Sequence, residues 1–207
     1  MAQRKYTSIP WTEYTVAEGN FDRTRKPIDL IVLHHTACTF QQAIAHFGSP
    51  TAGTSAHYIV SNKGDLAAML EEYYTAYHAG QYTVNQRSIG IETEWYEGMG
   101  DRTTSLYEKI SALVADICKY YNIPIDSDHI KPHKTYFNTA CPGTLDIPRI
   151  IDRAKAINTP VDPCANLKKE NEQLKASIDN LTKQLQAETV RRIAAENKLA
   201  QIANIVK

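Results

Sequence analysis

The last 43 residues constrain this chain most, because they contain no glycine, no proline and no aromatic residue. Nothing in such a segment interrupts a helix or favours a turn. Apolar side chains recur in it at alternating spacings of three and four residues, the heptad pattern of a coiled coil. One seam position carries Leu167, Leu174, Leu181, Ala195 and Ile202, and the other carries Asn171, Ile178, Leu185, Leu199 and Val206. The pattern therefore predicts one long helix over residues 165–207.

This predicted helix has an apolar stripe that only Glu188 and Arg192 interrupt with full charges. An isolated helix would leave that stripe in water, so we expect the chain to form a homo-oligomer through a coiled coil. Asn171, at a seam position, is a residue that often fixes register and favours two strands. The alternative is that the helix folds back on its own domain, although about 40 helical residues span roughly 60 Å, more than the width of so small a domain. The number of chains and the direction of the helices stay open.

A short segment with Pro160 and Pro163 precedes the helix. The whole chain of 207 residues has room for one ordinary domain and an appendage. We therefore predict a folded domain over residues 1–157, with its core at about 25–155, a linker over 158–164 and an oligomerisation helix over 165–207.

Charge and hydropathy exclude several kinds of partner. Lys and Arg number 23 and so do Asp and Glu, which argues against a nucleic-acid binder whose affinity rests on charge. No apolar run is long enough for a spanning helix, so we expect no membrane insertion. The first residues lack the apolar core of a secretory signal, and we expect synthesis in the cytoplasm.

Within the domain, apolar runs that predict strands alternate with helical patterns. Residues 28–33 form a nearly all-apolar run, which is typical of a strand buried on both faces. Residues 57–60 and 66–70 flank a polar turn and predict a hairpin, and residues 88–93 predict a further strand. This alternation predicts an α/β domain with a central mixed β-sheet flanked by helices.

Three helix starts are marked by capping residues. Thr39 with Gln42 has the spacing of a capping box, and so has Ser105 with Glu108. Asp146 is placed to cap a last helix in the domain.

Possible metal ligands follow the buried strand and recur near the end of the domain. His34 and His35 end the strand, His133 follows a proline, and Cys141 precedes Pro-Gly. A catalytic zinc site takes three ligands from His, Cys and carboxylate residues. Spacing alone leaves a metal site and purely structural roles both open.

Five sequence blocks follow one another in a fixed order. They are Ile31-Val-Leu-His-His-Thr-Ala37, Ser55-Ala-His-Tyr-Ile-Val60, Tyr77-His-Ala-Gly80, Arg87-Ser-Ile-Gly-Ile-Glu92 and Thr139-Ala-Cys-Pro-Gly143 with the preceding His133. Together they resemble the zinc N-acetylmuramoyl-L-alanine amidases found in bacteriophage endolysins, whose fold the peptidoglycan recognition proteins share. The resemblance covers roughly residues 25–155.

The resemblance implies that His34, His133 and Cys141 bind one Zn²⁺ per chain. It also implies hydrolysis of bacterial peptidoglycan, at the amide that joins N-acetylmuramic acid to L-alanine of the stem peptide. Two neutral imidazoles and a thiolate leave such a site at net +1, which suits polarising the amide carbonyl and lowering the pKa of a bound water towards about 7.

The family's acid–base residues carry over only in part. Some members use a tyrosine and a lysine at the positions where this chain has Ala56 and Thr139. Another branch has a glutamate in a Gly-Ile-Glu strand, and Glu92 matches it as the general base and acid. Thr139 resembles the threonine of the recognition-protein branch and is a candidate to hydrogen-bond an oxyanion.

Three further residues are candidates for substrate contact: His35, His78 and Tyr58. Structural roles for them, and a solvated role for Glu92, remain alternatives. The leading interpretation is an endolysin that acts on the cell wall after release from the cytoplasm. The alternative is a module of the same fold that binds peptidoglycan without cutting it.

Overall fold

The computed structural model describes residues 4–159 and 165–205. They belong to two units, one within residues 1–159 and one within residues 160–207. Most of the predicted linker, residues 160–164, lies outside the described residues.

The first unit is built on a six-stranded mixed sheet with the strand order β1-β5-β4-β7-β3-β8. Strand β3 pairs in parallel with both β7 and β8, whereas β4 and β5 form the predicted antiparallel hairpin. Strands β2 and β6 form a separate two-stranded sheet. The strands are β1 (Thr12–Glu13), β2 (Phe21–Asp22), β3 (Leu30–His35), β4 (Tyr58–Val60), β5 (Leu66–Ala68), β6 (Thr75–Ala76), β7 (Ser88–Thr93) and β8 (Ile130–Pro132).

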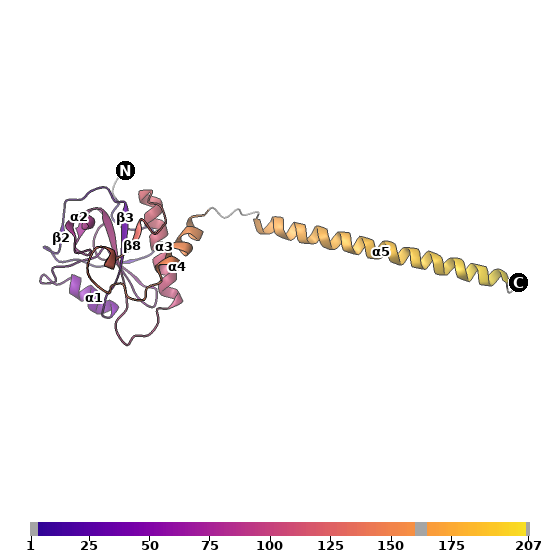
Figure 1. Cartoon of the computed structure of the whole chain (residues 1–207), viewed down its shortest axis with the longest axis horizontal. Helices are drawn as coiled ribbons and strands as arrows, with labels where there is room; N and C mark the ends of the chain where they lie inside the picture. The colour runs from indigo at the N-terminus through magenta and orange to yellow at the C-terminus, as the bar shows by residue number, and fades with distance from the viewer. Residues whose placement is uncertain (1–3, 160–164, 206–207) are drawn as a thin grey trace. The chain divides into compact units, whose positions relative to one another are not determined.

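Helices flank the sheet, which confirms the predicted fold class. They are α1 (Phe40–Phe47), α2 (Tyr82–Asn85), α3 (Thr104–Tyr121) and α4 (Ile147–Asn158), with a 3₁₀ turn η1 (His133–Thr135) after β8. Helices α3 and α4 lie side by side and apart from α1 (Figure 1). Because strand side chains alternate, Ile31 and Leu33 pack in the core with α3 and α4, while Leu30 and Val32 belong to a cluster with α2.

Two of the three predicted helix starts are confirmed. The Thr39 hydroxyl accepts the Gln42 N–H, and the Gln42 side chain accepts the Thr39 N–H in return. The Asp146 carboxylate accepts the Arg149 N–H at the start of α4.

The capping box predicted at Ser105 and Glu108 is wrong, since α3 begins earlier. Its N-cap is Thr103, whose hydroxyl accepts the Leu106 N–H. The Thr103 N–H in turn donates to the side chain of Asn62, in the hairpin turn between β4 and β5. This contact between distant segments selects Thr103 as the cap.

The second unit contains the predicted long helix, α5 (Ala165–Ile205). Large apolar side chains on its seam are exposed: Leu167, Leu174, Ile178, Leu181, Leu185 and Leu199. Among the described residues, no helix is both long and apolar enough to cross a membrane.

Candidate active site

The site forms where parallel strands end side by side. His34 on β3 is in register with Glu92 on β7, and Leu33 is in register with Pro132, the last residue of β8. His133 follows Pro132 directly. Three segments far apart in the sequence therefore bring their polar side chains to the carboxyl ends of the parallel strands. Ligands of open α/β sheets bind at such strand ends.

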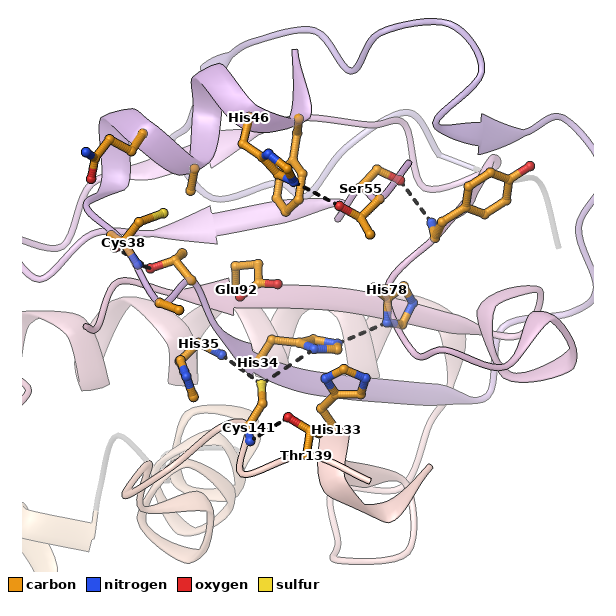
Figure 2. A pocket seen from close by; sticks show the side chains of 17 residues that line it. His34, His35, Cys38, His46, Ser55, His78, Glu92, His133, Thr139 and Cys141 are labelled. Carbon is orange, nitrogen blue, oxygen red and sulfur yellow. Dashed lines mark hydrogen bonds between the residues drawn. The ribbon is translucent and has the colours of Figure 1, made fainter. Parts of the chain in front are cut away.

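His34, His133 and Cys141 come together at this edge (Figure 2). Their ligand atoms all lie within 4.8 Å of one another, and Cys141 Sγ is 3.9 Å from His34 Nδ1. The backbone N–H of His35 donates to the same sulfur at 3.3 Å. Arg102 donates to the Pro142 carbonyl at 3.0 Å and so supports the loop that carries the cysteine.

These atoms fit a small divalent cation. Zinc bonds of about 2.0–2.3 Å would bring tetrahedral ligand atoms to roughly 3.3–3.8 Å from one another, close to the observed spacing. His133 Nε2 is buried without a hydrogen-bond partner among the described residues. An unpartnered buried nitrogen is costly, and a bound cation would satisfy it.

Burial controls the ionisation of these ligands. It lowers the pKa of His34 well below the ordinary value and also lowers the pKa of His133, so both imidazoles are neutral at pH 7. Burial raises the pKa of Cys141 to about 12, so the sulfur holds its proton until a cation displaces it.

A chain of hydrogen bonds fixes which nitrogen of His34 faces the cluster. The Ser88 hydroxyl donates to the Val84 carbonyl at 2.7 Å, so it accepts from His78 Nε2, which is 3.1 Å away. His78 Nδ1 is then an acceptor, and His34 Nε2–H donates a hydrogen bond to it at 3.0 Å. The lone pair of His34 Nδ1 is left on the side of Cys141, as a metal ligand requires.

Gly90 makes room for this chain. A Cβ atom at Gly90 would lie 2.6 Å from the ring of His78, a distance that side chains do not tolerate. The glycine of the Ser-Ile-Gly-Ile-Glu block therefore lets the His78 ring lie against strand β7, between Ser88 and His34.

Glu92 is the acidic residue in the lining of the pocket. Its Oε2 atom is buried without a hydrogen-bond partner among the described residues, and burial raises its pKa to about 8. A carboxyl group with such a pKa exchanges its proton near neutral pH, as a general acid and base must. Ala56, at the position of the family's tyrosine, is fully buried in an apolar cluster.

A pocket of about 640 Å³ surrounds these groups. Seven of the eight predicted site residues line it: His34, His35, His78, Glu92, His133, Thr139 and Cys141. The Thr139 hydroxyl accepts the Cys141 N–H at 3.2 Å, and a hydroxyl can still donate its own proton while it accepts.

The prediction that Tyr58 contacts substrate is corrected by the structure. Tyr58 is fully buried in the core that packs with α3. Its hydroxyl donates to Glu72 at 2.6 Å and accepts the Thr7 N–H at 2.7 Å. Alternation along β4 points the Tyr58 side chain to that face, and its neighbour Ile59 to the α1 face.

The pocket also has lining residues that were not predicted as site residues. These are, among the polar ones, Thr36, Cys38, Gln42, His46, Thr54, Ser55 and Tyr77. Gln42 and His46 are four residues apart on α1 and so share one face of that helix. That spacing, directly after the His34 strand, is a signal that could have identified this wall.

Solved structures with the same fold include an endolysin amidase and the catalytic domain of PlyG. The structure of PlyL has a TM-score of 0.62 at 18% identity and covers 70% of this chain and 97% of its own. The PlyG catalytic domain has a TM-score of 0.62 at 19% identity, covering 74% and 98%. The endolysin amidase LysCS from Clostridium intestinale has a TM-score of 0.56 at 21% identity, covering 72% and 98%.

The family model described as N-acetylmuramoyl-L-alanine amidase matches residues 24–144, and the chain belongs to this family. N-acetylmuramoyl-L-alanine amidase A from Achromobacter lyticus is 25% identical over 104 residues. That match covers 49% of this chain and 58% of the relative, so the chain spans little more than half of the relative's length.

Proposed function

We propose that this protein is a zinc-dependent peptidoglycan hydrolase that cleaves the amide between N-acetylmuramic acid and L-alanine of the stem peptide. The observation that carries the proposal is the convergence of His34, His133 and Cys141 in one pocket with Glu92. Membership of the amidase family supports the choice of bond.

Zinc is the cation that the donor set favours, because two imidazoles and one thiolate are typical zinc ligands. His34, His133 and Cys141 would hold it, and the bound ion would supply polarisation of the amide carbonyl and a lower pKa for water. The His78–Ser88 hydrogen bonds keep His34 in the tautomer that presents Nδ1.

Proton transfer is assigned to Glu92. Its carboxylate takes the proton of the attacking water and returns it to the nitrogen of the leaving L-alanine. Thr139 is assigned to the amide oxygen, to which its hydroxyl donates a hydrogen bond as negative charge develops. His35, at the edge of the pocket beside Trp95, is assigned to substrate contact.

The biological role we propose is that of an endolysin. The protein is made in the cytoplasm and acts on the bacterial cell wall after release. The endolysins among the solved structures that share its fold support this role.

Metal analysis of the purified full chain and mass spectrometry of digested cell wall test the proposal together. We expect about one zinc per chain and stem peptides released with a free L-alanine amine. Cys141→Ser should lose both, since it removes one ligand. Cys38→Ser is the matched control, because Cys38 also lines the pocket but is outside the ligand cluster.

A chain that binds the wall but leaves the lactyl–alanine linkage intact would instead be a binding module, and the hydrolase would be ruled out. A chain that cuts the wall without bound metal would overturn the zinc assignment alone.

A further inference from the structure

We propose that two copies of this chain associate through α5 as an antiparallel coiled coil centred on residue 190. The exposed seam is the starting point. Leu181, Leu185 and Leu199 are 63%, 69% and 66% exposed, although leucine at such positions is typical of a buried interface. A second copy of the same seam is the occupant that matches it in both length and charge.

Two charges on the seam define the direction and the register. Glu188 and Arg192 occupy consecutive seam positions, one of each type. In an antiparallel pair, each type of seam position faces the other type on the partner helix. Glu188 of each copy can then face Arg192 of the other, so that both charges are paired across the interface.

The same register matches the rest of the seam. On either side of the two charges, the facing residues by position in the sequence are Leu185 with Ala195 and Leu181 with Leu199. Both of these pairs are apolar on both sides.

A parallel pair would place identical seam residues opposite each other. Glu188 would then face Glu188 and Arg192 would face Arg192, and like charges at close range destabilise a pairing. The parallel arrangement gains edge pairs between Arg191 and Glu196 and between Glu170 and Lys175, and the antiparallel arrangement brings Arg191 of one copy near Arg191 of the other. Exposed charges at such edge positions contribute little. Within its own helix, Arg191 lies 3.7 Å from Glu188, and Glu196 lies 3.5 Å from Arg192.

Antiparallel pairing would connect one catalytic unit to each end of the paired helices. If the proposed function holds, two such units on one polymeric substrate raise the effective concentration of the second once the first is bound. The pairing itself does not depend on the proposed function and is measured without substrate.

Sedimentation equilibrium of the full chain tests the pairing. We expect the native protein to sediment with twice the chain mass of 23.3 kDa. Glu188→Arg places two Arg–Arg contacts in the interface and should raise the dissociation constant at least about tenfold. Glu188→Arg combined with Arg192→Glu reverses both pairs and should restore the native value to within about threefold.

Asp179→Arg is the matched control, because it makes the same change of charge at an exposed position outside the seam. It should leave the dissociation constant within about threefold of native. Circular dichroism of each variant shows whether α5 stays helical.

A native monomer, or a mass of four chains, overturns the proposal. A Glu188→Arg variant that associates as strongly as the native chain also overturns the proposal. That result is expected of a parallel pair, in which the substitution only replaces a Glu–Glu contact by an Arg–Arg contact. If the double variant Glu188→Arg with Arg192→Glu stays helical but does not regain the native dissociation constant, this register is excluded.

Discussion

Glu92 has one carboxylate oxygen that is buried and has no hydrogen-bond partner in the described part of the chain. Burial raises the pKa of this carboxyl to about 8, whereas an exposed glutamate titrates near pH 4. Glu94, two residues further on, has its carboxylate occupied by the backbone N–H groups of Phe40 and Asn62. Of these two neighbouring acids, only Glu92 lines the pocket.

Substituting each glutamate in turn tests this difference between Glu92 and Glu94. Glu92→Gln should retain bound zinc but lower the rate of amide hydrolysis by about 10²- to 10⁴-fold, because the amide side chain cannot accept the proton of water. Zinc content and the rate of stem-peptide release measure the two effects. Glu94→Gln should keep a rate close to native. Full activity of Glu92→Gln would mean that another group transfers the proton.

Strand β7 carries alternating side chains with separate tasks. Ile89 and Ile91 pack in the core with α3, while Ser88, Gly90 and Glu92 face the side of the site. Along that face one residue orients His78, the next leaves space for its ring and the last supplies the carboxyl group. The site therefore depends on the register of a whole strand, and not only on the three candidate ligands.

Gly90→Ala tests whether the shape of strand β7 positions the His78 ring. The added methyl group would meet the His78 ring at 2.6 Å and displace it, and His34 would lose its orienting hydrogen bond. We expect the affinity for zinc to fall by about 10- to 100-fold although every ligand is still present. Competition with a chromophoric chelator measures the affinity.

The control for this variant is Gly48→Ala, at the end of α1. A Cβ atom there meets its nearest neighbour at 3.4 Å, and the backbone conformation suits any residue. It should leave zinc affinity unchanged. An equally unchanged affinity in Gly90→Ala would show that the position of the His78 ring does not affect the metal site.

At the scale of the whole domain, Asp116 on α3 connects the N-terminal segment to the rest of the first unit. Its carboxylate accepts hydrogen bonds from the hydroxyls of Thr7 and Ser8. It also forms an ion pair with Arg4 at 2.7 Å. Burial by itself raises the pKa of Asp116, but the hydrogen bonds from Ser8 and Thr7 and the charge of Arg4 outweigh it and hold the pKa below the ordinary value.

This lowered pKa predicts how the stability of the domain depends on pH. A carboxyl group whose pKa is lower in the folded state contributes stability above the pKa of the unfolded state, and that contribution is lost as the pH falls through the folded value. Asp116→Asn should therefore lower the free energy of unfolding by about 1–3 kcal/mol at pH 7. The difference from the native chain should shrink below about pH 4.

Urea denaturation over a series of pH values measures this difference. Asp152→Asn, an exposed change on α4, is the control and should follow the native chain throughout. A difference that stays constant from pH 7 to acid would contradict the role assigned to the ionised carboxylate.

Features that follow from periodicity and from short motifs could be predicted before the fold was known. The heptad pattern was enough to predict α5, and the alternation of apolar runs with helical patterns was enough to predict the mixed sheet. The five ordered blocks were enough to predict the amidase family. The helix and strand signals are local, because each depends on residues within a few turns or one strand of each other. The family signal is instead the order of short blocks from Ile31 to Gly143.

Features that depend on contacts between segments far apart in the sequence could be found only from the folded chain. Asn62 selects Thr103 as the cap of α3, and Glu72 and Thr7 engage the hydroxyl of Tyr58 in the core. The hydrogen bond of His78 to His34 likewise joins residues 44 positions apart. Local sequence could not predict these contacts, because each depends on which side chains the folded sheet and helices bring within reach.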